Sequence, residues 1–169
     1  MFMSDPILID PKVLAEQAQH LAGQIRLSEM DERVSRHEFL AERQTPVSFA
    51  LQGGCDKRQR LYLDLSVSAQ LSLVCQRCMQ PLPFALNEQA RIVLFDSEEA
   101  LDEAMVAEEE LEGMLPEAQL DVGTLVEEQI LMALPYAPCH ESCHSDKLDA
   151  VNQDRPNPFA ALAALKSGR

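Results

Sequence analysis

The sequence has few aromatic residues, few basic residues and no long apolar run, and each shortage excludes a class of protein. Its 169 residues include no tryptophan, and aromatic residues make up only 5% of the chain. A platform on which nucleic-acid bases stack is therefore not expected. The chain has 14 basic and 28 acidic residues, a net charge of -14. This balance argues against a general nucleic-acid-coating protein, because phosphate binding needs clustered Lys and Arg.

Segments typical of membrane, secreted and nucleotide-binding proteins are also missing. No apolar run approaches the roughly 20 residues of a membrane-spanning helix. Residues 1–10 lack the basic start and the apolar core of a signal peptide, so we expect none. We find neither a glycine-rich phosphate loop nor a Ser-His-Asp signature. The length and the 46% apolar content instead suit one folded domain of ordinary size.

The negative charge is concentrated in one segment. Residues 1–95 contain 11 acidic and 10 basic side chains, whereas residues 96–154 contain 17 acidic side chains and a single lysine. Residues 155–169 contain three basic side chains and no acidic one. Dense like charges repel, so we expect a solvated acidic loop over about residues 96–117. This loop is either an ordinary solvated surface or a docking surface for a basic protein partner.

Two alternating segments in the middle of the chain predict an antiparallel hairpin. Apolar residues hold the odd positions over residues 61–75, and they hold every even position over residues 82–94 except Glu88. A period of two gives a strand one buried side and one side that faces water. The intervening residues 76–81 predict the turn, which places Cys75 and Cys78 at the hairpin tip.

Two helices are expected to cover the buried face of the sheet. Asp10 followed by Pro11 is typical of a helix start, and Gly23 marks the expected end of this first helix. Asp121 predicts the start of a second helix over residues 122–134, with a capping box at Thr124 as the alternative start.

The expected fold class is α+β. It consists of an antiparallel β-meander with a long central hairpin, packed by two main helices, plus an acidic loop and a short C-terminal helix. Residues 1–135 are expected to form the single domain. Residues 136–169 are expected to form a proline-punctuated linker and the short C-terminal helix.

Four of the five cysteines fall into two pairs that predict a metal site. The pairs are Cys75 with Cys78 and Cys139 with Cys143, with His140 or His144 as substitute ligands. Two thiolates on a tight turn can supply half of a tetrahedral zinc site. Our expectation leaves two alternatives open, namely no cofactor or one structural zinc ion. A redox role is disfavoured because no helix begins after Cys78 to lower the thiol pKa.

Several side chains are candidates for contact with RNA or a partner. The arginines near the hairpin are Arg58, Arg60, Arg77 and Arg91. They would form a modest basic patch if the two turns lie on one side, and are otherwise ordinary solvated arginines. Near the C-terminus, Phe159, Leu162 and Leu165 share one side of the expected helix. That helix either folds back on the sheet or docks in a partner groove.

Three separated segments together carry a family resemblance. They read VCQRCMQP over residues 74–81, VEEQILMALP over residues 126–135 and RPNPFAALAALK over residues 155–166. In this order they resemble the YceD family, the large ribosomal RNA subunit accumulation proteins of bacteria and plastids. The resemblance implies a cytoplasmic, non-catalytic factor for the synthesis, processing or stability of 23S ribosomal RNA. It also implies that the second cysteine pair occurs in some members and is lost in others.

We therefore expect a ribosome-biogenesis factor that binds rather than catalyses. The expected partner is large-subunit ribosomal RNA or its precursor, contacted directly or through a basic ribosomal protein. We expect neither a membrane association nor a small-molecule substrate. The alternative is a small acidic interaction protein that escorts or inhibits a basic protein partner.

Overall fold

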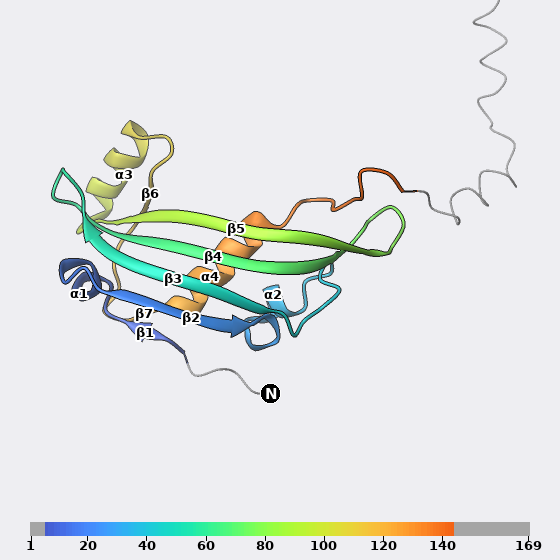
Figure 1. The fold of residues 1–169 in the computed structure, drawn as a ribbon. Helices are drawn as coiled ribbons and strands as arrows, with labels where there is room; N and C mark the ends of the chain where they lie inside the picture. Colours follow the sequence, from blue (N-terminus) through green and yellow to red (C-terminus); the bar gives the residue numbers. More distant parts are fainter. Residues whose placement is uncertain (1–5, 144–169) are drawn as a thin grey trace, which may run out of the picture.

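A five-stranded sheet forms the centre of the structure, a computed structural model that describes residues 6–143 (Figure 1). The strands are β2 (His20–Arg26), β3 (Pro46–Cys55), β4 (Leu61–Val74), β5 (Pro81–Leu94) and β6 (Glu112–Met114). They lie in this order, antiparallel except for the parallel pair β5–β6. A short ribbon pairs β1 (Leu8–Ile9) with β7 (Leu120–Asp121).

Short helices lie between the strands of the described region, and one more helix follows the last strand. They are α1 (Pro11–Glu16), the 3-10 turn η1 (Leu27–Glu29), α2 (Glu32–Ser35), α3 (Glu98–Ala107) and α4 (Val122–Ala133). In Figure 1, α4 crosses the sheet behind its long strands, and α3 stands at the end where the β3–β4 turn lies. Helix and antiparallel sheet together confirm the predicted α+β class. Between residues 6 and 143, no helix is long and apolar enough to cross a membrane.

The predicted hairpin is confirmed as the pair β4–β5. The strands pair along their whole length, from Tyr62 with Val93 to Val74 with Pro81. The odd positions of β4 from Leu63 to Leu73 are buried, as their alternation predicts. They pack with Leu14 and Ala15 of α1 and with the apolar side of α4 in one core. The α4 residues of that core are Val122, Val126 and Ile130.

Both predicted helix starts are also confirmed. The Asp10 carboxylate accepts the N–H of Val13 at 3.1 Å, and the Asp121 carboxylate accepts the N–H of Gly123 at 2.9 Å. Each carboxylate satisfies a backbone donor that the first turn of the helix leaves without an intrahelical partner. The alternative start at Thr124 is not used.

The end of the first helix differs from the prediction. Helix α1 stops at Glu16, and Gly23 lies within β2 instead of ending a helix. Ala18 turns the chain with a φ of 48°, and seven residues of β2 then pair with β3. These ladder hydrogen bonds outweigh the local helical spacing of the apolar residues. Gly23 fits here because the Phe49 ring lies against its Cα, 3.0 Å from where a Cβ would stand.

The predicted acidic loop also differs, because it contains a helix. Residues Glu98–Ala107 form α3, and Ser97 accepts the N–H of Ala100 at 3.2 Å as its cap. Alanine and glutamate favour helix, and carboxylates in the first turn are stabilised by the helix dipole. No residue of α3 is buried, so the predicted exposure is correct although the loop is not. The expected C-terminal helix and His144 lie outside the described residues.

Candidate metal centre and charged surfaces

The turn between β4 and β5 brings the first two cysteines together. The Cys75 N–H donates to Gln80 O at 2.9 Å, and the Met79 N–H donates to Cys75 O at 2.9 Å. Met79 adopts a left-handed φ of 60°, which lets the chain reverse within these few residues. The turn therefore places Cys78 beside Cys75 at the hairpin tip, as the sequence predicts.

The segment after α4 reaches the same tip. In Figure 1 it runs from the end of α4 toward the β4–β5 turn. The Gln76 N–H donates to Pro138 O at 2.8 Å, and the His140 N–H points at the Cys75 sulfur at 3.5 Å. These two contacts fix where the segment lies relative to the turn.

Four side chains converge there with their metal-ligating atoms. The ligand atoms of Cys75, Cys78, His140 and Cys143 all lie within 4.8 Å of one another. Cys75 is buried and the other three are half-buried. This group could hold a metal ion. The predicted ligand Cys139 is exposed and lies outside the group, whereas His140, predicted as a substitute, lies inside it.

The surroundings affect two of the three thiols in the group differently. Burial opposes ionisation of Cys75, but the N–H groups of Cys78, His140 and Arg77 outweigh it and lower the pKa of Cys75 to about 5. Burial and the neighbouring thiols raise the pKa of Cys143 to about 11. The tip therefore favours a thiolate at Cys75 and accommodates one negative charge more easily than two.

The four arginines do not form a single patch. Arg77 lies at the β4–β5 turn, while Arg58 and Arg60 lie at the β3–β4 turn, at the opposite end of the long strands. Each strand of the hairpin has 14 residues, so about 45 Å separates the two ends.

Carboxylates already engage the arginines at the β3–β4 end. Arg60 pairs with Asp56 at 2.8 Å and with Glu108 at 2.9 Å, and Arg58 also pairs with Glu108. Glu108 follows α3, so these pairs join the acidic segment to the β3–β4 turn. The pKa of the Glu108 carboxyl is lowered, mainly by its hydrogen bond with the Arg60 guanidinium and also by the nearby charge of Arg58. The negative charge of the acidic segment is thus partly neutralised where it meets the sheet.

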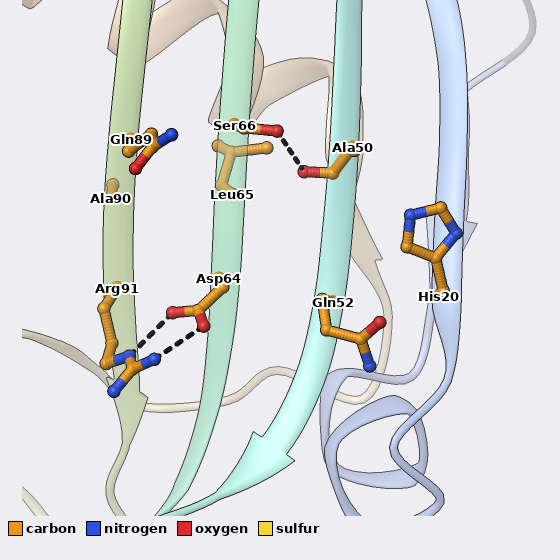
Figure 2. Close-up of a pocket in the computed structure, with 9 residues that line it drawn as sticks. All are labelled: His20, Ala50, Gln52, Asp64, Leu65, Ser66, Gln89, Ala90 and Arg91. Atoms are coloured by element: carbon orange, nitrogen blue, oxygen red, sulfur yellow. Dashed lines mark hydrogen bonds and ion pairs between the residues drawn. The ribbon is translucent and has the colours of Figure 1, made fainter.

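The open face of the sheet is polar, and it is hollowed into a depression of about 470 Å³. Figure 2 shows Arg91 and Asp64 forming a two-pronged ion pair between β5 and β4, with both distances 2.7 Å. His20 and Gln52 extend from the two neighbouring strands. The alternation along β4 predicts that its even-numbered side chains face water, and two of them, Asp64 and Ser66, line this depression. Among the described residues, the depression contains no nucleophile paired with a base.

Sequence reasoning missed two features of the site. Pro81 contributes its carbonyl oxygen, which lies 3.1 Å from His140 Nε2, and a backbone contact has no signal in the sequence. Glu108 partners both Arg58 and Arg60, but a separation of about 50 positions hides the pairing. The predicted contact residues Phe159, Leu162 and Leu165 lie outside the described residues.

The described residues define a class of protein that has a polar, open antiparallel sheet, an exposed acidic helix and a tip rich in metal-ligating side chains. The family described as large ribosomal RNA subunit accumulation protein YceD matches residues 63–166, more than half of the chain. The chain belongs to this family. A Haemophilus influenzae protein of that name is 26% identical over 176 aligned positions, which cover 95% of each chain. No solved structure matches the chain significantly.

Proposed function

We propose that this protein is a cytoplasmic ribosome-biogenesis factor needed for the accumulation of large-subunit ribosomal RNA. The observation that carries the proposal is family membership over residues 63–166, together with a relative that aligns along nearly the whole chain. The predicted resemblance rested on three short segments, and the family match spans them. The name of the Haemophilus influenzae relative refers to accumulation of large-subunit ribosomal RNA, and we extend that role to this chain.

The protein acts by binding rather than by catalysis. The polar face in Figure 2 offers two amides, one hydroxyl and an ion pair, which suit hydrogen bonding to a partner surface. The proposed function needs no cofactor for chemistry, and a metal bound at the hairpin tip would only stabilise the fold.

Charge supports contact with ribosomal RNA through a basic ribosomal protein. The exposed α3 has Glu98 and Glu99 in its first turn, and Met105 and Val106 near its end are exposed apolar residues. Such a surface complements a basic protein with apolar side chains. Direct contact with phosphate falls to Arg77, because carboxylates engage Arg58, Arg60 and Arg91.

Depletion of the protein in growing cells tests the proposed function. We expect the ratio of large-subunit to small-subunit ribosomal RNA to fall and to recover when the full chain is expressed again. Crosslinking before cell lysis then identifies the RNA and the proteins that it contacts, and a large-subunit ribosomal protein is expected. An unchanged ratio with normal precursor processing contradicts the proposal.

A further inference from the structure

We propose that Cys75, Cys78, His140 and Cys143 bind one zinc ion, which fastens the segment after α4 to the tip of the β4–β5 hairpin. The inference goes beyond the proposed function, because it concerns how the protein is held together. It rests on the placement of the four ligand atoms and on the hydrogen bonds around them.

The distances between ligand atoms match those of a tetrahedral zinc site. Zn–S bonds of about 2.3 Å and Zn–N bonds of about 2.0 Å at tetrahedral angles place two sulfurs about 3.8 Å apart and a sulfur and a nitrogen about 3.5 Å apart. Here the Cys75 and Cys143 sulfurs are 3.7 Å apart, and Cys78 Sγ lies 3.4 Å from His140 Nδ1. All four ligand atoms fall within 4.8 Å of one another, so the space suits a single ion.

The histidine has the orientation of a metal ligand. Its Nδ1 faces the sulfurs, while Nε2 lies 3.1 Å from Pro81 O and donates its hydrogen to that carbonyl. Metal-bound histidines commonly donate the hydrogen of their second ring nitrogen in this way, which leaves the first nitrogen free to coordinate. The carbonyl thus selects the tautomer that a zinc ion requires.

Backbone N–H groups also support a thiolate at Cys75. The N–H of Arg77 lies 3.4 Å from Cys75 Sγ, and the N–H of His140 lies 3.5 Å from it. One donor comes from each of the two segments that the ion joins. The same sulfur therefore belongs to the turn and contacts the segment after α4, as expected of a ligand shared between them.

The fourth ligand is His140 and not Cys139. The hydrogen bond from the Gln76 N–H to Pro138 O fixes the phase of the chain, so that His140 turns inward and Cys139 stays exposed. Three sulfurs and one nitrogen, all from the protein, complete a tetrahedron without an open position. Such closed sites are typical of structural zinc, and soft thiolates favour zinc over magnesium or calcium.

Metal analysis of the full chain, purified without a histidine tag under reducing conditions, tests the site. We expect about one zinc per chain in the wild type and at least a tenfold loss in Cys143→Ser. Cys139→Ser is the matched control, since it removes a neighbouring thiol that does not face the ion, and it should keep full zinc content. His140→Ala should lose zinc, whereas His140→Cys should keep it, because a fourth thiolate also suits the site.

Each alternative outcome overturns the proposal. These outcomes are a wild type with less than a tenth of a zinc per chain, iron in place of zinc, loss of zinc in Cys139→Ser, or a Cys75–Cys143 disulfide detected by mass. His140→Cys guards against a failure to fold, and cobalt in place of zinc gives a second measurement, because its visible absorption reports tetrahedral thiolate ligands. None of these measurements depends on ribosomal RNA, so the metal site and the proposed function fail independently.

Discussion

Contacts with distant segments close both ends of the β4–β5 hairpin, but the two ends use opposite chemistry. At the tip, the side chains of three cysteines and one histidine lie close together, and Cys75 among them is buried. At the other end, the β3–β4 turn meets the acidic segment through ion pairs centred on Arg60 and Glu108. These ion pairs are half-buried and partly screened by water, so we expect them to contribute modestly to stability, whereas clustered thiolates gain much from one metal ion. The comparison suggests that the tip depends on its ligand and the other end depends on packing.

The largest expected effect tests whether packing holds the ion-pair end. A Cβ on Gly53 would stand 2.2 Å from the backbone oxygen of Leu14, where α1 rests on β3. We expect Gly53→Ala to lower the free energy of unfolding by about 3 kcal/mol, because backbone on both sides must move. Urea unfolding measures this change.

The neighbouring glycine provides the control for this substitution. A Cβ on Gly54 meets the far end of the Tyr62 side chain at 2.5 Å, and a side chain can move away. We expect Gly54→Ala to cost less than about 1.5 kcal/mol. Equal costs for the two substitutions would contradict the close approach of α1 to β3.

The next effect concerns the tip and depends on the proposed zinc. Chelation should free the N–H groups of Gln76 and His140, which hold the two segments together. We expect their hydrogen exchange to accelerate about a hundredfold, while the backbone N–H groups of Arg58 and Arg60 keep their rates. Exchange measured by NMR before and after chelation makes the comparison within one molecule. A uniform change at both ends would show that the ends are not independent.

Ionisation of Asp56 gives a smaller effect at the ion-pair end. Asp56 Oδ1 accepts the N–H groups of Arg58 and Arg60 at 2.8 and 2.9 Å. Burial alone would raise the pKa of Asp56, but the hydrogen bonds from Arg60 and Arg58 hold it below the ordinary 3.8. A lowered pKa contributes stability that is fully present above pH 3.8 and is lost as the pH falls through the folded-state value.

Asp56→Asn tests this contribution. The amide keeps the oxygen acceptor but removes the charge beside Arg60, so we expect a loss of about 1 kcal/mol at pH 7. The difference from the wild type should shrink as the pH falls below 3.8. Urea unfolding at neutral and acidic pH measures both values. If the stability difference between Asp56→Asn and the wild type does not change with pH, the charge of Asp56 does not account for it.

The sequence predicts the elements that depend on local patterns better than those that depend on pairing between distant segments. Strict alternation of apolar residues predicts β4, β5 and the turn between them, because the period of two is the geometry of the strand itself. Asp10 and Asp121 predict helix starts because a cap is a local interaction. The pairing of β2 with β3 overrides the local pattern that suggested a helix as far as Gly23.

In the candidate site, too, some features follow from local sequence and others depend on contacts between distant segments. The pair Cys75 and Cys78 follows from the turn, but the choice of His140 over Cys139 depends on one backbone hydrogen bond to Pro138 O. No residue type encodes that bond. Likewise, the basic residues of the β3–β4 turn are visible in the sequence, but their partner Glu108 is brought to them only by α3.

The smallest expected effect on stability separates Arg58 from Arg77 as contacts for RNA. Both are exposed, and we expect either substitution by alanine to change stability by less than about 0.5 kcal/mol. Their charges differ in availability, because Arg58 pairs with Glu108, whereas the described residues show no ion pair for Arg77. Arg77→Ala should therefore weaken binding to a large-subunit ribosomal RNA fragment and reduce the salt slope by about 1, while Arg58→Ala leaves both nearly unchanged. Filter binding across a salt series measures the slope. The opposite ranking would place the RNA contact at the ion-pair end and show that Glu108 releases its arginines to a stronger anion.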